Sequence, residues 1–232
     1  LGREIRPLGV VEPFPGNNLF LTIDLDLQKT AEEAYQDKNG ALIAMDPKTG
    51  RILAMVSKPS FEPDNFARNI LPEEWKSLVE NPHHPLQNKG IQGQYPAGSV
   101  FKIITAIAGL ESRTITPATQ FTCAGAFSYG NRDFRCWKEG GHGSLSLHRA
   151  IVESCDIYFY QLGLKLGPDL LARYASEFGL GRVTGISLPH ERPGIVPSSS
   201  WKKKRFGVPW YSGETLSFSV GQGYLNATPL QL

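Results

Sequence analysis

Apolar residues recur along the first part of the chain in two patterns, one helical and one typical of strands. Over residues 25–35 they lie at helical spacing, and the preceding Asp24 is of a type that caps helices. Two apolar runs follow at 41–45 and 51–56, and segment 46–50 between them, Asp-Pro-Lys-Thr-Gly, has the residues of a tight turn. We therefore predict a helix and then a β-hairpin, with strands so apolar that both faces should be buried.

Less regular chain surrounds this hairpin. The first 18 residues carry several prolines and are predicted to be a loop, and the apolar run at 19–23 is predicted to be a strand. Residues 57–98 are predicted to be mostly irregular, with one short helix over 72–79, where a proline and two glutamates suit a first helical turn. A long irregular stretch inside a domain is usually functional or disordered.

The second half of the chain is predicted to be mainly helical. Residues 99–111 are apolar nearly all round, which is typical of a central, buried helix. The glycine-rich and aromatic segment 123–143 indicates a loop or a small hairpin. Helices are then expected over residues 146–153, 157–164 and 168–178, the last of them starting at a proline and followed by a glycine.

Composition and charge limit the class of protein. Of the 232 residues, 41% are apolar and 20% charged, which is enough for a core and excludes wholesale disorder. A net charge of +2 is too small to indicate a nucleic-acid-binding protein, and three cysteines are too few for a disulfide scaffold. No apolar run approaches the about 18 residues of a membrane-spanning helix. The basic run 202–205 is interpreted as a solvated surface.

Ser99 and Lys102 form the sharpest candidate for chemistry. Ser99 follows a Pro-Ala-Gly segment that must end any earlier helix, so it marks a helix start, and Lys102 lies about one turn later on the same face. A lysine in a first turn opposes the helix dipole, which suggests a function. A desolvated amine can take the proton of a nearby hydroxyl, and a helix N-terminus can stabilise an oxyanion. The alternative is a capping serine followed by a lysine that extends to solvent.

Further segments carry a family resemblance. Ser99-x-x-Lys102 is followed 55 residues later by Ser154-Cys155-Asp156, the order of the Ser-x-x-Lys and second Ser motifs of penicillin-recognising enzymes. With the segments 40–55, 95–102, 213–224 and 228–231, nearly the whole chain resembles the transpeptidase domain of class B penicillin-binding proteins. The form with Asp156 in third place is most similar to the elongation-type members.

This resemblance implies a fold and a role for each motif residue. The fold implied is α+β: an antiparallel sheet flanked by helices, beside a mainly helical part that holds the serine. Ser99 would be the acylated nucleophile, Lys102 its base, and Ser154 the relay of a proton to the leaving amine. Asp156 would help to orient the substrate peptide. The implied reaction cleaves a D-Ala-D-Ala stem peptide of peptidoglycan and joins the acyl group to a neighbouring peptide, and β-lactams would block Ser99.

One motif of the family is out of place. A Lys-Thr-Gly should follow Ser154, whereas the chain contains it only as Lys48-Thr49-Gly50, inside the predicted hairpin turn. We interpret that copy as turn chemistry. Residues 1–232 are therefore expected to be a penicillin-binding transpeptidase domain that lacks the C-terminal part with the Lys-Thr-Gly strand, and that is inactive alone.

Four metal-competent residues cluster around the second motif. Cys123, Cys136, His142 and Cys155 fall within 33 residues, and three thiolates with one imidazole complete a tetrahedral structural zinc site. The spacing lacks the tight pairs of zinc fingers, so a Cys123–Cys136 disulfide and plain buried cysteines remain alternatives. Asp133 could replace one thiolate as an oxygen ligand. Since Cys155 lies inside the second motif, a metal there would fix that motif to the glycine-rich loop.

The resemblance also implies partners and a location. We expect a periplasmic domain, anchored in the inner membrane by an N-terminal helix outside this sequence, that works with a membrane glycosyltransferase and the elongation machinery and binds no nucleic acid. Two alternatives share the serine chemistry: a related hydrolase such as a serine β-lactamase or carboxypeptidase, and a β-lactam sensor or degenerate binding domain. No glutamate falls in a motif that would activate water, which a β-lactamase requires.

Overall fold

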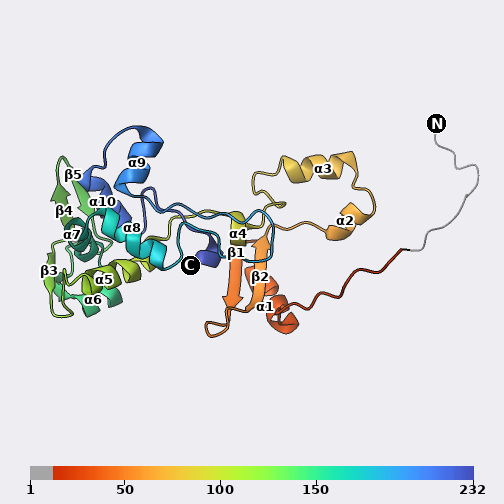
Figure 1. The fold of residues 1–232 in the computed structure, drawn as a ribbon, viewed down its shortest axis with the longest axis horizontal. Coiled ribbons are helices and arrows are strands. Elements are labelled where there is room, and N and C mark those ends of the chain that lie inside the picture. Colours follow the sequence, from red (N-terminus) through yellow and green to blue (C-terminus); the bar gives the residue numbers. More distant parts are fainter. Residues whose placement is uncertain (1–12) are drawn as a thin grey trace, which may run out of the picture.

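A computed structural model describes residues 13–232 and arranges them in two lobes (Figure 1). The hairpin lobe contains α1 to α4 with β1 and β2, and the serine lobe contains all elements from the 3₁₀ turn η1 to α10. Irregular chain of residues 180–198 and 220–228 runs between the lobes. None of the helices in the described part of the chain is long and apolar enough to cross a membrane.

The hairpin lobe is built on the predicted helix and β-hairpin. Helix α1 covers Leu25–Tyr35, and the Asp24 side chain caps it by accepting the Leu27 amide at 3.0 Å. Strands β1 (Gly40–Met45) and β2 (Ile52–Lys58) pair antiparallel. Asp46 stabilises the turn between them: its carbonyl accepts the Gly50 amide and its side chain accepts the Lys48 amide. The local chemistry of this segment therefore fixes the hairpin.

Two predictions for this lobe are wrong. Residues 19–23 form no strand: the segment is fixed beside β2 by single bonds, such as Thr22 Oγ1 to Ile52 O at 2.6 Å, which do not make a ladder. The hairpin is also not buried on both faces, since in its two strands only Ala54 and Val56 are fully buried. Helix α1 packs against β2 from one side, with Ala31 in a small core. The predicted proline-rich loop is confirmed for residues 13–18, and residues 1–12 lie outside the described part.

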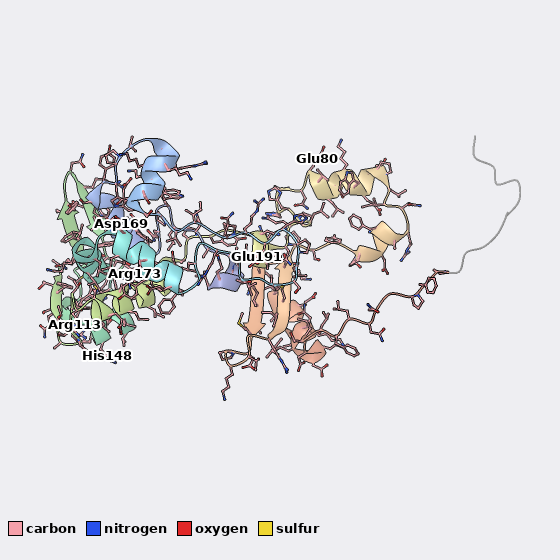
Figure 2. The ribbon with its side chains drawn as sticks, viewed as in Figure 1. Glu80, Arg113, His148, Asp169, Arg173 and Glu191 are labelled. Carbon is pink, nitrogen blue, oxygen red and sulfur yellow. The ribbon has the colours of Figure 1, made fainter. Side chains whose placement is uncertain are left out.

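Three short helices occupy the stretch that was predicted to be mostly irregular with one short helix. Helix α3 covers Pro72–Val79, which confirms the prediction, and Glu80 follows it directly (Figure 2). Helices α2 (Pro63–Ala67) and α4 (Lys89–Gln92) were not predicted, because each is shorter than two turns and shows no apolar period. Helix α4 contacts both strands of the hairpin and leads directly toward Ser99.

The serine lobe is mainly helical with two small sheets. Its strands pair as β3 with β6 and β4 with β5, so segment 123–143 contains the small hairpin that was predicted. The elements follow the chain as η1 (Gly98–Phe101), α5 (Lys102–Glu111), β3 (Gln120–Cys123), β4 (Ala126–Tyr129), β5 (Arg132–Arg135), β6 (Gly143–Ser146), α6 (Leu147–Val152), α7 (Asp156–Leu166) and α8 (Pro168–Glu177).

Helix α7 forms the centre of this lobe. Seven of its residues are buried, and all of these except Gly163 belong to one large apolar core that also includes side chains of α5, α6, α8 and α10. The segment predicted as one central helix, residues 99–111, forms η1 and α5 and is less central than predicted, because Val100 and Ile103 are about half exposed, at 53% and 54%. The core therefore surrounds the helix that begins directly after the second motif.

The last helices complete the serine lobe. Helix α9 (Ser199–Phe206) is fastened to α8 by Asp169, which accepts the Ser199 amide at 2.8 Å (Figure 2). Helix α10 (Ser212–Ser219) packs on α7, whereas the 3₁₀ turn η2 (Pro229–Gln231) lies at the hairpin lobe and contacts α4 and β1. The prediction of a solvated basic run is wrong for Lys202, which is 2% exposed and donates to both oxygens of Glu214 at 2.6 Å.

Candidate active site and metal centre

Ser99 lies in a tight turn at the start of the α5 region. Gly98, just before it, has a left-handed backbone (φ +58), which a residue with a side chain rarely adopts. Residues Gly98–Phe101 form a 3₁₀ turn that continues into α5 at Lys102. Ser99 is exposed, whereas Phe101 and Lys102 are buried. This local geometry presents the hydroxyl to solvent while the next turn anchors in the core.

Lys102 is a buried cation with three acceptors. Its side chain is 4% exposed, and its Nζ donates to Asp156 Oδ1 at 2.7 Å, to Ser154 O at 2.8 Å and to Ser154 Oγ at 3.0 Å. The Phe159 ring lies 5.7 Å away and completes the enclosure. A buried ammonium needs this degree of pairing, because an unpaired charge in the interior is costly.

Ser154 connects the lysine to Ser99. It sits between α6 and α7 with φ +47, a left-handed conformation that is uncommon for a residue with a Cβ. Two backbone bonds hold this bend: the Ser154 amide donates to Ile151 O and the Cys155 amide to Ala150 O. From there the Ser154 hydroxyl donates to Ser99 Oγ at 3.1 Å. Ser99 and Ser154, 55 residues apart in the chain, are thus hydrogen-bonded to each other, and Ser154 is also bonded to Lys102.

Asp156 turns toward Lys102. It is the first residue of α7, where a carboxylate also faces the positive end of the helix dipole. Its side chain is 20% exposed and makes the short ion pair with Lys102. The four residues expected from the two motifs therefore form one connected hydrogen-bonded set.

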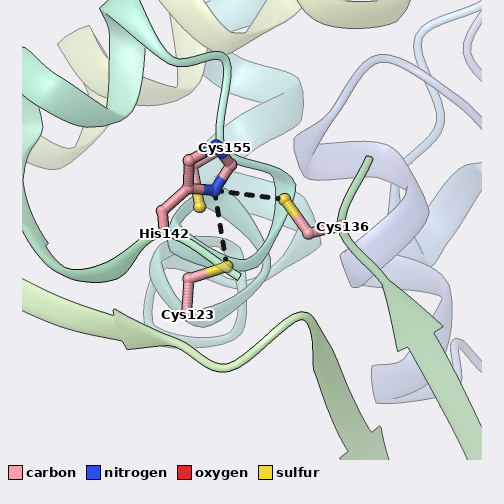
Figure 3. Close-up of side chains that lie close together, drawn as sticks. All are labelled: Cys123, Cys136, His142 and Cys155. Carbon is pink, nitrogen blue, oxygen red and sulfur yellow. Dashed lines mark hydrogen bonds between the residues drawn. The ribbon is translucent and has the colours of Figure 1, made fainter. Parts of the chain in front are cut away.

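The three cysteines and His142 converge in a second cluster (Figure 3), which is linked to the first because Cys155 lies between Ser154 and Asp156 in the chain. The potential ligand atoms all lie within 4.8 Å of one another, and all four residues are buried. His142 Nδ1 lies 3.5 Å from the sulfurs of Cys123 and of Cys136. Cys123 ends β3, whereas Cys155 stands immediately before α7, so the cluster joins four different parts of the lobe.

The electrostatics of the cluster depend on burial and on backbone amides. Burial raises the pKa of the Cys155 thiol to about 12, and the neighbouring thiols add to the shift. Burial also raises the pKa of Cys136, but backbone amides, including those of Lys138 and Asp156, donate to its sulfur and lower the pKa overall. Burial lowers the pKa of His142 and keeps its imidazole neutral, the form that binds metals.

The donor set fits a structural zinc ion. Thiolates crowded at this distance repel one another, and a divalent cation among them would reverse that effect. All three cysteines are free, as ligands must be, and three sulfurs with one imidazole make a set typical of four-coordinate zinc. Asp133 is not part of the cluster, because it lies on β5 and accepts from Ser128 Oγ at 2.6 Å.

Two residues beside the cluster were not anticipated from the sequence. His142 Nε2 is buried without a hydrogen-bond partner and lies 3.9 Å from Glu153 Oε2. In metal sites, the ring nitrogen that does not bind the metal often donates to a carboxylate. Trp137 lies against the His142 ring, with centroids 5.3 Å apart, and its indole donates to Glu153 O at 2.9 Å. Both residues are adjacent in sequence to a predicted site residue, and that adjacency was the only available signal.

The Lys48-Thr49-Gly50 copy lies in the β1–β2 turn, as interpreted. The Lys48 amide and the Thr49 hydroxyl both donate to the Asp46 carboxylate, and these bonds lower the pKa of Asp46, with the Thr49 bond the larger cause. Gly50 adopts φ +71. Turn formation accounts for all three residues of this copy.

Comparison with known proteins gives one consistent result. Residues 40–232 match the family described as "Penicillin binding protein transpeptidase domain". The chain is 42% identical over 230 residues to the peptidoglycan D,D-transpeptidase MrdA of Acinetobacter baumannii, covering 98% of this chain and 34% of that protein. The chain thus spans about a third of the length of this curated relative.

Solved structures with a similar fold are of the same kind. PBP2 of Pseudomonas aeruginosa, in complex with the compound WCK 5153, superimposes with a TM-score of 0.90 at 40% identity, covering 95% of this chain and 48% of that one. PBP2 of Helicobacter pylori in its complex with MreC also gives 0.90, at 39% identity, covering 99% and 43%. The predicted fold class, that of penicillin-binding transpeptidases, is confirmed.

Proposed function

The chain belongs to the penicillin-binding protein transpeptidase family, and on that premise we propose that it acts in a peptidoglycan D,D-transpeptidase of the cell-elongation type. One observation supports the proposal most directly: Ser99, Ser154 and Lys102 form a continuous hydrogen-bonded line on residues from two distant motifs. A hydroxyl connected to a buried lysine is the arrangement that an activated serine nucleophile requires.

The reaction proposed is a two-step acyl transfer. Ser99 Oγ attacks the carbonyl carbon of the D-Ala-D-Ala amide, its bond to carbon forms, and the C–N bond breaks to release D-alanine. An amine of a second stem peptide then attacks the ester, the peptide cross-link forms, and the Ser99 hydroxyl is restored. A β-lactam presents a similar amide inside a ring, so its acyl group stays attached to Ser99 after the ring opens.

Each site residue has a defined part in moving protons. To act as the base, Lys102 must first give up one Nζ proton. The hydrogen bonds of the line then reverse, and Ser99 yields its proton toward Lys102 through the Ser154 hydroxyl, which lies 3.1 Å from Ser99 Oγ and 3.0 Å from Lys102 Nζ. Ser154 returns the proton to the leaving amine. Asp156 was expected to orient the substrate, but its ion pair with Lys102 supports a different part, that of holding the lysine in place.

We also propose that Cys123, Cys136, His142 and Cys155 hold one structural zinc ion. Four protein ligands leave no open position for water or substrate, so the metal would supply rigidity rather than chemistry. Cys155 stands between Ser154 and Asp156 in the chain, and the cluster therefore fixes the bend that aims the Ser154 hydroxyl.

The relatives support a proposal for the setting of the whole protein. One similar structure is a complex of PBP2 with MreC, and another is of a peptidoglycan synthase complex that coordinates polymerisation and crosslinking. By analogy, we place this domain in the periplasm at the inner membrane, working with a membrane glycosyltransferase and other proteins of the elongation machinery. Its substrates are stem peptides of peptidoglycan.

The nucleophile is tested with labelled penicillin on the intact protein. We expect one stable adduct per chain, located on Ser99 by peptide mass spectrometry and absent from Ser99→Ala. Ser112→Ala, which changes a serine that caps the far end of α5, serves as the matched control and should label normally. Labelling that survives Ser99→Ala would contradict the assignment. Rapid turnover of the adduct would indicate a β-lactamase, and a cross-linking assay on lipid-linked substrate separates a transpeptidase from a sensor.

Elemental analysis tests the metal. We expect about one zinc per chain, as a single four-ligand site requires. Cys155→Ser should lower the zinc content, the melting temperature and the rate of penicillin acylation, because the ligands depend on the metal for their order. Asp133→Asn, a change at a metal-competent residue outside the cluster, should alter none of the three. Metal-free protein with a Cys123–Cys136 disulfide would favour the alternative pairing.

A further inference from the structure

One segment, residues 219–227, makes backbone contacts on both sides of Ser99 in the chain. Tyr95 and Ala227 exchange a pair of backbone hydrogen bonds, both 2.9 Å, and the Gly98 amide donates to Gly221 O at 2.9 Å. Thr105, one turn into α5, donates from its hydroxyl to Ser219 O at 2.8 Å. The backbone is therefore fixed to this segment before and after Ser99.

Gly221 makes the tightest of these contacts. A Cβ added there would overlap the Gly98 carbonyl oxygen and would lie 2.7 Å from the Gly98 nitrogen and 2.8 Å from the Cβ of Phe101. Carbon atoms of real side chains do not approach so closely, so the two backbones touch only because Gly221 has no side chain. Its backbone is also left-handed, with φ +75.

The same segment also packs closely against α7, the helix that follows Ser154. Gly163 on α7 leaves room for Ser219, since a Cβ at Gly163 would overlap the Ser219 Cβ and lie 2.8 Å from its Oγ. Phe218, just before this segment, stacks on Phe101 with ring centroids 5.3 Å apart. Helix α7 and the Ser99 turn thus meet the end of α10 at two close backbone approaches.

We propose that Gly221 is a positioning residue, whose missing side chain lets segment 219–227 set the separation between Ser99 Oγ and Ser154 Oγ. The inference rests on the proposed acyl transfer, in which that separation, 3.1 Å, carries the proton. A methyl group at Gly221 would need to move the Gly98 carbonyl by more than one ångström to reach ordinary contact near 3.4 Å. A displacement of that size at a nucleophile costs about 10- to 100-fold in rate.

The test compares Gly221→Ala with Gly223→Ala in the intact protein. Gly223 has the same backbone conformation, φ +74, but the atom nearest to an added Cβ is Ser217 Cβ at 3.4 Å, so this control introduces the backbone strain without the overlap. For penicillin, Gly221→Ala should lower the acylation rate constant about 10- to 100-fold. Its noncovalent dissociation constant should stay unchanged, and Gly223→Ala should acylate at nearly the normal rate.

Three results would overturn the inference. They are an unchanged acylation rate in Gly221→Ala, an equal loss in Gly223→Ala, and a loss confined to noncovalent binding. If Gly221→Ala does not fold, Thr105→Val decides, because it removes the bond to Ser219 O while Thr105→Ser keeps it. A normal acylation rate in Thr105→Val would then overturn the inference.

A second measurement separates this inference from the proposed function. If the unmodified protein takes up no penicillin, the proposed function fails, and crystal structures still decide the positioning role. The Ser99 Oγ to Ser154 Oγ distance should lengthen in Gly221→Ala and stay near 3.1 Å in Gly223→Ala. An unchanged distance in both variants would contradict it.

Discussion

Ser154 combines a strained backbone with the central position of the site. A side chain in the left-handed region costs about 1–2 kcal/mol, and such strain persists only where the surroundings impose it. Here the surroundings are the two backbone bonds of the bend and the hydrogen bonds of its hydroxyl to Ser99 and from Lys102. At the scale of single residues, the site is therefore held at the expense of stability.

A pair of variants at Ser154 measures this strain. Ser154→Ala and Ser154→Gly both lose the hydroxyl, but only glycine relieves the left-handed conformation. The glycine variant should be about 1 kcal/mol more stable than the alanine variant by urea unfolding, and both should acylate slowly. Equal stability of the two variants would show that the bend is not strained.

The Lys102–Asp156 pair gives a second prediction at this scale. Asp156→Ala should lower the free energy of unfolding by about 2–4 kcal/mol, because it leaves a buried ammonium without its counter-charge. The double variant with Lys102→Met should recover most of that loss, since no buried charge remains. A double-mutant cycle by urea unfolding makes the measurement, and a loss in the double variant as large as in Asp156→Ala would contradict it.

At the scale of elements, helix α7 governs the serine lobe. Its first residue belongs to the site, and its buried side chains form the centre of the core. Two of them are tyrosines: burial raises the pKa of Tyr158, and likewise that of Tyr160, to about 12. A buried phenol resists ionisation because the interior solvates its anion poorly.

This shift predicts an alkaline loss of stability. The folded pKa of Tyr158 lies above the ordinary value of 10, so its contribution is complete below pH 10 and is lost as pH rises toward 12. At pH 11 the loss from this one group is about 1.4 kcal/mol relative to pH 8. Urea unfolding at the two pH values should show a correspondingly smaller difference in Tyr158→Phe.

At the scale of the whole molecule, the two lobes differ greatly in core size. The serine lobe contains one large buried cluster, whereas the hairpin lobe has only Ala31, Ala54 and Val56 fully buried in its own small one. Few backbone bonds join the lobes, among them the Arg192 amide to Ile91 O at 2.9 Å. Because opening a region costs less where less apolar surface is buried, the hairpin lobe should open first.

Native-state hydrogen exchange tests this order. Amides of α5 and α7 should exchange only through global unfolding, and those of β1 and β2 through a smaller opening. Leu162→Ala, in the large core, should lower the global free energy by about 3 kcal/mol, whereas Val56→Ala should affect mainly β1 and β2. Equal protection of the two lobes would refute the order.

Much of the local structure followed from the sequence alone. Helix 25–35, the hairpin with its Asp46 turn and helix 72–79 were predicted, because caps, turn residues and apolar periods act between neighbours in the chain. The family was also evident from the sequence, since its motifs are short and keep their order. The candidate residues Ser99, Lys102, Ser154 and the four of the metal cluster could be named on the same basis.

Only the tertiary structure decided where those residues go. Ser99 meets Ser154 across 55 residues of chain, and Gly221 touches the turn from still farther along, contacts that no local pattern encodes. Two further outcomes depend on residues outside the local segment. The apolar run at 19–23 forms no strand because no neighbouring strand pairs with it in a ladder, and Lys202 is buried because Glu214 pairs with its charge. Local propensity acts through neighbouring residues, whereas burial and pairing depend on the packing of the whole fold.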